Sequence, residues 1–348
     1  MAGKRIGFFT RLLDDAPAGE RYRLAAEQIV HAERHGFDSA WVAQHHFHRD
    51  EGGLPSPLPF LAFVAARTSR IRLGTGIIIL PMEDPVRIAE DTVTVDLLSG
   101  GRLEVGLGTG TTPETFLAFG IEKGERADVF ARKLDMLHRA WSGAELGHPQ
   151  NRLYPAADNL QERTWHATFS VAGAERIGKA GAGLMLSRTQ PRSPERPDAT
   201  LPEIQNPIVD AYLANLPAGI APRIMASRSL FVADSRVEAL RHAERGLNAV
   251  LERFVASGHR LADRSLAGLI RSLDTHVGAP DDVIASLQAD TVLPRATDVV
   301  FQVHSVDPPH PLVLRSIELT AEAVAPALGW REAPSQQPVR LRPLTATA

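Results

Sequence analysis

Cysteine is absent from this chain of 348 residues. Its absence excludes disulfide bonds, thiolate nucleophiles and cysteine-ligated metal sites. A strong charge of one sign is also lacking, because the formal net charge is only −3 and the sequence contains no basic block. Non-specific binding to nucleic acid therefore has no electrostatic basis, and we expect no nucleic-acid partner.

Long apolar runs are missing as well. No uninterrupted apolar stretch reaches the roughly 18 residues that a membrane-spanning helix requires. The N-terminal sequence leads directly into an apolar strand and lacks the apolar core of a signal peptide. We therefore expect a cytoplasmic protein without a membrane partner. Hydrophobic residues make up 44% of the chain and charged residues 23%, a composition that favours one large core over global disorder.

Short apolar strands alternate with amphipathic helices along the chain, as in a parallel sheet covered by helices. We expect eight strands, each followed by helix, at residues 5–9, 38–43, 71–80, 102–107, 166–171, 183–187, 224–232 and 297–303. A doubly wound open sheet fits less well, because the strands keep one period from end to end. The pattern predicts a single (β/α)8 TIM barrel over residues 1–330, a length within the usual range of that fold.

Two segments interrupt this regular pattern. Residues 188–207 contain five prolines and follow the sixth strand, so we expect a long insertion loop that shapes the active-site pocket. Residues 331–348 are polar and rich in proline, which predicts a disordered tail.

Three groups of residues in the first third of the chain form a recognisable set. Residues 36–47 read GFDSAWVAQHHF, and residues 72–85 read RLGTGIIILPMEDP. The third group comprises RIAED at 87–91, DLLSGGR at 96–102 and GLGTG at 106–110. In order and spacing, over residues 5–120, these segments resemble the bacterial luciferase-like family of flavin-dependent monooxygenases. The resemblance implies the same luciferase-like barrel and a flavin site.

The active site of a (β/α)8 barrel lies at the C-terminal ends of its strands. Residues that follow different strands should therefore converge on one rim, although they are far apart in the sequence. The candidates that meet this condition are His45, Thr75, Gly76, Ile77, Gly108, Thr109, Ser170, Gly173 and Arg188.

His45 and His46 allow three interpretations. A histidine at a strand end often only hydrogen-bonds a neighbouring loop. A metal site that adds His48 is disfavoured, because adjacent side chains on a strand point to opposite faces, and we expect no metal. The family resemblance implies that His45 is a catalytic acid or base beside the flavin, whereas His46 has a positional role.

Glycines interrupt the third strand, where they often mark close approach of a ligand or a simple bulge. The resemblance implies a non-proline cis peptide bond at Gly76–Ile77, against the flavin ring. The GLGTG segment lacks the last glycine of a dinucleotide fingerprint, so it is expected to give room to a flat ligand at Gly108 and Thr109.

The family often carries an arginine where this chain has Thr109. Ser170, with the amides near Gly173 at a helix N-terminus, is one substitute anchor for the flavin phosphate, and Arg188 is another. The alternatives are an ordinary helix cap for Ser170 and a solvated loop charge for Arg188.

The resemblance implies an FMN-dependent monooxygenase that uses reduced FMN and O2 to oxidise a small organic substrate. Because the chain lacks a dinucleotide motif, a separate flavin reductase would supply the reduced FMN, and the family suggests a homodimer. The alternatives are an F420-dependent reductase or dehydrogenase and a flavin-binding protein without catalysis.

Overall fold

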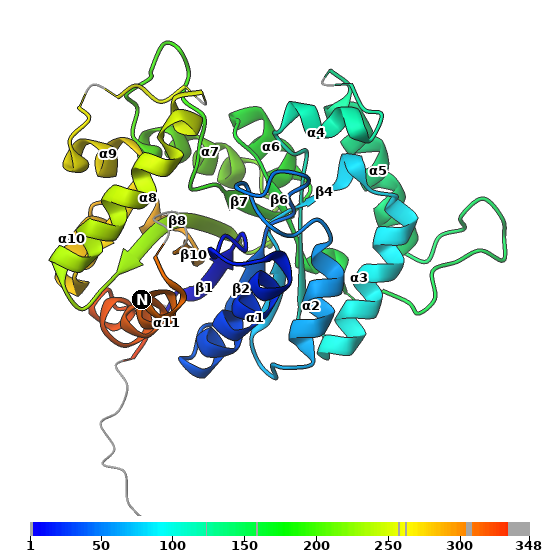
Figure 1. The fold of residues 1–348 in the computed structure, drawn as a ribbon. Coiled ribbons are helices and arrows are strands. Elements are labelled where there is room, and N and C mark those ends of the chain that lie inside the picture. The colour runs from blue at the N-terminus through cyan, green and yellow to red at the C-terminus, as the bar shows by residue number, and fades with distance from the viewer. Residues whose placement is uncertain are drawn as a thin grey trace, which may run out of the picture.

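The strands of the protein form one closed parallel barrel. The computed structural model describes residues 3–122, 124–157, 159–256, 258–261, 263–303 and 308–332. In this part of the chain the barrel strands are β1 (Arg5–Thr10), β2 (Ser39–Val42), β3 (Arg72–Thr75), β5 (Leu103–Gly108), β6 (Thr164–Ala167), β7 (Gly183–Leu186), β8 (Ile224–Val232) and β10 (Asp298–Gln302). Pairing of β8 with β10 closes the barrel (Figure 1). The predicted (β/α)8 fold is confirmed.

Helices surround the barrel on its outer side (Figure 1). They are α1 (Ala18–Arg34), α2 (Pro57–Ala65), α3 (Pro85–Ser99), α4 (Pro113–Ala118), α5 (Arg126–Trp141), α6 (Val171–Lys179), α7 (Leu201–Ala214), α8 (Arg236–Ala256), α9 (Leu266–Ser272), α10 (Pro280–Gln288), α11 (His310–Leu319) and α12 (Ala325–Ala327). A π-helical turn, Thr320–Val324, joins the last two. Within the described residues, no helix combines the length and the apolar character that crossing a membrane requires.

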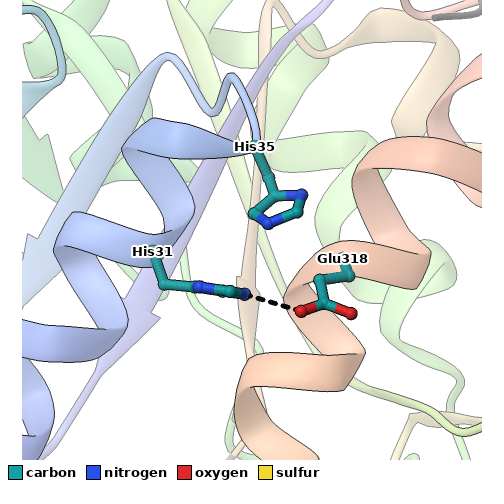
Figure 2. Close-up of side chains that lie close together, drawn as sticks. All are labelled: His31, His35 and Glu318. Atoms are coloured by element: carbon teal, nitrogen blue, oxygen red, sulfur yellow. Dashed lines mark hydrogen bonds and ion pairs between the residues drawn. The ribbon is translucent and has the colours of Figure 1, made fainter. Parts of the chain in front are cut away.

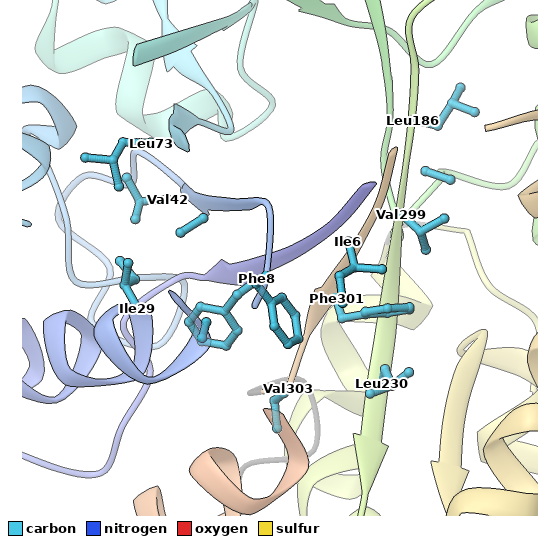
Figure 3. Close-up of a cluster of buried hydrophobic side chains, with 14 of the residues drawn as sticks. Ile6, Phe8, Ile29, Val42, Leu73, Leu186, Leu230, Val299, Phe301 and Val303 are labelled. Carbon is cyan, nitrogen blue, oxygen red and sulfur yellow. The ribbon is translucent and has the colours of Figure 1, made fainter. Parts of the chain in front are cut away.

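Successive side chains of each strand point alternately out of and into the barrel, which creates two apolar regions. Ile6 and Phe8 of β1 face outward, and Phe8 lies near Ile29 of α1 in the core between barrel and helices (Figure 3). The barrel interior holds a separate cluster, whose fully buried members are Trp41, Trp165, Met185, Met225 and Val300. The two tryptophan rings meet edge to face, with centroids 5.8 Å apart. Phe8 therefore packs the core and does not line the mouth.

Two glycines make room for the interior tryptophans. A Cβ atom on Gly74 would lie 2.1 Å from the Trp41 ring, and one on Gly183 would lie 2.4 Å from the Trp165 ring. Real Cβ atoms do not approach other atoms so closely, so a side chain at either position would displace an indole. The glycine at position 74 thus serves the packing of the barrel rather than a ligand.

Segment 71–80 is not the continuous strand that its apolar run predicts. It consists of β3 and of β4 (Ile78–Ile79), which pairs with β5. The cis peptide bond Gly76–Ile77 separates the two strands. The sequence reading also missed β9 (Thr275–Gly278), which pairs with the second half of β8 outside the closed barrel.

The insertion after β7 is shorter than predicted, because α7 begins at Leu201. Thr200 caps this helix: its hydroxyl accepts from the Glu203 amide, and the Glu203 carboxylate accepts from the Thr200 amide at 2.8 Å. This reciprocal capping box fixes the start of the helix. Pro202 lies in the first turn, where proline is tolerated, and Pro207 lies inside the helix. The loop is therefore residues 188–200. Of the predicted tail, residues 333–348 lie outside the described residues.

Candidate active site at the barrel mouth

The mouth of the barrel has an apolar floor. Phe9, Ile77 and Ala167 are partly exposed and pack on the fully buried layer that contains Trp41 and Trp165. They come from the C-terminal ends of β1 and β6 and from the segment between β3 and β4. An apolar surface of this kind, with polar groups around it, suits an aromatic ligand.

The expected cis bond at Gly76–Ile77 is present. Gln44, which is buried, supports the segment that follows it. The Gln44 Oε1 atom accepts a hydrogen bond from the Ile79 amide at 2.7 Å, and its Nε2 atom donates to Pro55 O at 3.1 Å and to the Glu83 carboxylate. The sequence analysis did not identify Gln44. Its position, directly after a buried strand and before two histidines, could have indicated a role at the rim.

His45 lies on the rim with Glu51 beside it. Its Nδ1 atom is 3.9 Å from Glu51 Oε2, and 24% of the side chain is exposed. The backbone holds this loop in place: the His45 amide donates to Leu54 O at 2.9 Å, and the Arg11 guanidinium donates to Glu51 O. The loop that carries the imidazole is therefore held by hydrogen bonds, and the ring is partly exposed.

The pKa of the Glu51 carboxyl is lowered to about 2. The neighbouring His45 imidazole is the main cause, and the Thr112 hydroxyl, 3.2 Å from Glu51 Oε2, adds to it, while burial opposes the shift. Glu51 is thus ionised at neutral pH. A fixed carboxylate at this place orients the ring and balances the charge that the ring carries when it is protonated.

His46 has different neighbours. Its Nε2 atom lies 3.0 Å from Gln44 Nε2, and its ring meets the edge of the Phe119 ring at 5.0 Å between centroids. Burial lowers the pKa of His46, with Glu83 opposing. In the described part of the chain, His45, His46 and His48 do not gather into a set of metal ligands.

The ends of β5 and β6 form one corner of the mouth, because these strands pair directly. Thr109 is half-buried there, and Ser170 caps α6 by accepting from the Gly173 amide at 3.1 Å. At the same corner, Arg126 donates to Gly110 O at 3.1 Å. The sequence reading missed Arg126, because it begins a helix and follows no strand directly.

Two further candidates have clear packing roles. Thr75 is fully buried, and its hydroxyl donates to Gly106 O at 2.9 Å and accepts from Gly106 N at 2.8 Å, so it joins β3 to β5. A Cβ atom on Gly108 would lie 2.3 Å from Ile77 Cδ1. The missing side chain at Gly108 therefore makes room for Ile77, which belongs to the floor.

Arg188 is buried and reaches the opposite side of the mouth. Its Nε atom donates to Gln302 Oε1 at 2.7 Å, and its Nη1 atom donates to Ser229 Oγ at 3.1 Å. Gln302 and Ser229 are register partners on β10 and β8. The guanidinium is thus on the β8–β10 side, away from the corner that holds Ser170.

Comparison with known proteins identifies the family of the chain. The family model described as luciferase-like monooxygenase matches residues 6–296, and the chain belongs to this family. It is therefore an oxidoreductase, as the resemblance implied. The 4-hydroxyprotoasukamycin monooxygenase of Streptomyces nodosus subsp. asukaensis is 28% identical over 306 residues, which cover 82% of each chain.

Other relatives match over shorter stretches. An uncharacterised protein of Sinorhizobium fredii is 40% identical over 173 residues, and this match spans about half of each chain, 47% and 49%. The F420-dependent glucose-6-phosphate dehydrogenase of Nakamurella multipartita is 33% identical over 137 residues, which cover 35% of this chain and 40% of the relative.

Solved structures share the whole fold. A monooxygenase from Streptomyces bottropensis superposes with a TM-score of 0.74 at 25% identity, covering 93% of this chain and 99% of that one. The oxygenating constituent of 3,6-diketocamphane monooxygenase from Pseudomonas putida, a type II Baeyer–Villiger enzyme in complex with FMN, also has a TM-score of 0.74. It is 18% identical, with 93% and 98% coverage.

The Glu51 carboxylate makes stability depend on pH. Its folded-state pKa, about 2, lies below the ordinary 4.5, so its stabilisation is present above pH 4.5 and is lost as the pH falls toward 2. We expect Glu51→Gln to lower the free energy of unfolding at pH 7 by about 1–2 kcal/mol, after allowance for solvent screening. Urea unfolding at pH 7, 5 and 3 should show this difference shrinking below pH 5.

Glu252→Gln, at an exposed position of α8, is the matched control and should change stability little at any pH. A Glu51→Gln deficit that stays the same from pH 7 to pH 3 would mean that packing, not charge, is lost.

Proposed function

We propose that the protein is an FMN-dependent monooxygenase that uses reduced FMN and O2 to oxidise a small organic substrate. The observation that carries the proposal is the apolar floor of Phe9, Ile77 and Ala167, bordered on one side by His45 and on another by the Ser170 corner. The match to 4-hydroxyprotoasukamycin monooxygenase, which spans 82% of each chain, supports a monooxygenase function.

The residues present fit this cofactor. The ring would lie on the floor, next to the Gly76–Ile77 peptide, and the phosphate would lie at the N-terminus of α6, near Ser170 and Gly173. Arg126 supplies a cation at that corner. Arg188 would border the ring from the β8–β10 side, so we propose Arg126 in its place as the partner of the phosphate. When bound, reduced FMN supplies the two electrons for O2 activation.

His45 would hold or move one proton at the reacting centre. Its imidazole is at the rim, and Glu51 keeps the ring oriented through Nδ1. Nε2, on the other side of the ring, is then the atom that exchanges a proton with the substrate or the cofactor. The charge that the ring gains in this step is balanced by the ionised Glu51 carboxylate.

Exposed apolar side chains at the rim suggest the substrate class. Phe47, Leu117 and Phe119 are exposed, and the Phe47 and Phe119 rings lie 6.2 Å apart. Such side chains favour contact with an apolar organic molecule. A separate reductase would supply the reduced FMN, because the chain carries no dinucleotide fingerprint. The homodimer expected from the family stays a prediction.

An F420-dependent oxidoreductase is the second candidate, and the match to an F420-dependent dehydrogenase favours it. Anaerobic titration with reduced FMN and with reduced F420 separates the two. Because Trp41 and Trp165 lie under the floor, a bound flavin should quench tryptophan fluorescence. We expect saturable quenching with FMN and, after mixing with O2, a slower reoxidation than that of free FMN. Binding of F420, with no FMN binding in either redox state, would overturn the proposal.

His45→Ala tests the proton-transfer role. A general acid or base contributes about 10²–10⁴-fold, so turnover should fall by that factor while FMN affinity changes only a few-fold. His46→Ala is the matched control: it should keep most of the turnover and lower the thermal unfolding temperature, because His46 packs on Phe119. Full turnover in His45→Ala would leave this residue with a structural role. The same steady-state assay also tests the non-catalytic alternative, which predicts no turnover in the wild type.

Arg126→Ala tests the phosphate corner. Loss of a charge-assisted contact should weaken FMN binding by about 1–3 kcal/mol. Riboflavin, which lacks the phosphate, should bind Arg126→Ala and wild type alike. Arg188→Ala, on the other side of the mouth, should affect FMN and riboflavin equally. A selective loss of FMN in Arg188→Ala but not in Arg126→Ala would reverse this assignment.

A further inference from the structure

A cluster of histidine and glutamate side chains lies outside the barrel, where the end of α1 meets the end of α11. His31 lies in the last turn of α1 and His35 caps this helix, four residues further on; Glu318 and Glu322 have the same spacing at the end of α11 and in the π-helical turn after it. Residues four apart share one helix face. The two helices pack against each other, so the histidine pair faces the glutamate pair.

The contacts within this cluster are short. His31 Nε2 is 3.1 Å from Glu318 Oε1, and His35 Nδ1 is 3.1 Å from Glu322 Oε1. The two imidazole rings lie 4.4 Å apart between centroids. Figure 2 shows the His31 ring directed toward the Glu318 carboxylate, with the His35 ring close to the His31 ring. One ligand atom from each of His31, His35 and Glu318 lies within 4.8 Å of the others.

A neighbouring arginine holds the carboxylate in place. Arg315 donates to Glu318 Oε2 at 2.7 Å, which leaves Oε1 directed at His31. The charge of Arg315 is itself balanced by Asp234, at 2.7 Å. Glu318 is therefore ionised and presents one oxygen, and the hydrogen bond from Arg315 is the main reason that its pKa is lowered.

The cluster is open to solvent on one side. The side chains of His31, His35 and Glu318 are 18%, 24% and 25% exposed, so an ion can reach the cluster from solvent.

We propose that His31, His35 and Glu318 form a binding site for a divalent transition-metal ion of the zinc class, with water or Glu322 as the fourth ligand. Two imidazoles and one carboxylate are a ligand set that zinc accepts. Ligand bonds of about 2.0–2.1 Å place the atoms of a tetrahedral site about 3.4 Å apart. The His31–Glu318 separation is already close to that, so a small rotation of the His35 ring completes the set.

Binding of a metal ion at this site would link α1 to α11. β1 and β10, which precede these helices, are neighbours in the barrel. Glu322 lies in the π-helical turn, a feature that often occurs at functional sites. The site would act on stability and not on the mouth, so it is independent of the proposed monooxygenase function.

Isothermal titration of the untagged full chain with Zn²⁺ tests the proposal. We expect one ion per chain. His31→Ala and His35→Ala should each bind Zn²⁺ about tenfold more weakly than the wild type, or more weakly still. His148→Ala, which removes an exposed histidine elsewhere, is the matched control and should bind Zn²⁺ like the wild type. At a hundredfold excess over the dissociation constant, Zn²⁺ should raise the thermal midpoint of the wild type by about 4 °C.

Glu318→Gln adds a second readout, because the amide keeps the shape of the carboxylate but lowers the metal affinity. Thermal unfolding without Zn²⁺ shows that each variant is folded. Absence of stoichiometric Zn²⁺ binding to the wild type would overturn the proposal. So would equal Zn²⁺ affinity in the wild type, His31→Ala and His35→Ala.

Discussion

Closure of the sheet between β8 and β10 is the constraint on which the rest of the structure depends. Because every barrel strand runs in the same direction, closure brings all their C-terminal ends to one rim. His45, Ser170 and Arg188 are far apart in the sequence and meet at the mouth only for this reason. Closure also sets the neighbours of each residue: Ser229 lies beside Gln302, and together they receive the Arg188 guanidinium.

In the closed barrel, hydrogen bonds of polar side chains fix the loops of the rim. Gln44 makes hydrogen bonds to the segment after the cis bond, to Pro55 and to Glu83, so it fixes three chain segments with one amide. Glu51 fixes the orientation of His45 in a similar way. A buried polar group without partners is costly, so these contacts hold the loops in one arrangement. The rim is thus organised before any ligand binds.

Much of the fold could be predicted from the sequence, because strands of a parallel barrel are buried on both faces and appear as short apolar runs. The bounds of β8, residues 224–232, follow from such a run. Local sequence signals gave wrong predictions where a residue contacts another that is distant in the sequence. The glycine at position 74 looked like a ligand contact, but it accommodates Trp41 from the neighbouring strand.

The site was predictable to a similar degree. The position of His45 at the end of β2 and the cis bond at Gly76 follow from the family resemblance. The direction of the Arg188 side chain could not be predicted in this way, because it depends on its hydrogen-bond partners on β8 and β10. Arg126 and Glu51 gave no signal either: one begins a helix and the other lies in a loop, and only the folded chain brings them to Gly110 and His45.

The N-terminal end of the barrel is filled by paired charges. Arg5 pairs with Asp298, and Arg72 pairs with Glu104, within the first two residues of their strands. Trp165 Nε1 donates to Glu104 Oε2 at 2.8 Å, so the charged layer is joined to the apolar one above it. Paired charges and two indoles thus fill the N-terminal half. In the described part of the chain, the floor of Phe9, Ile77 and Ala167 therefore lies toward the rim, which is where the proposed cofactor and substrate would enter.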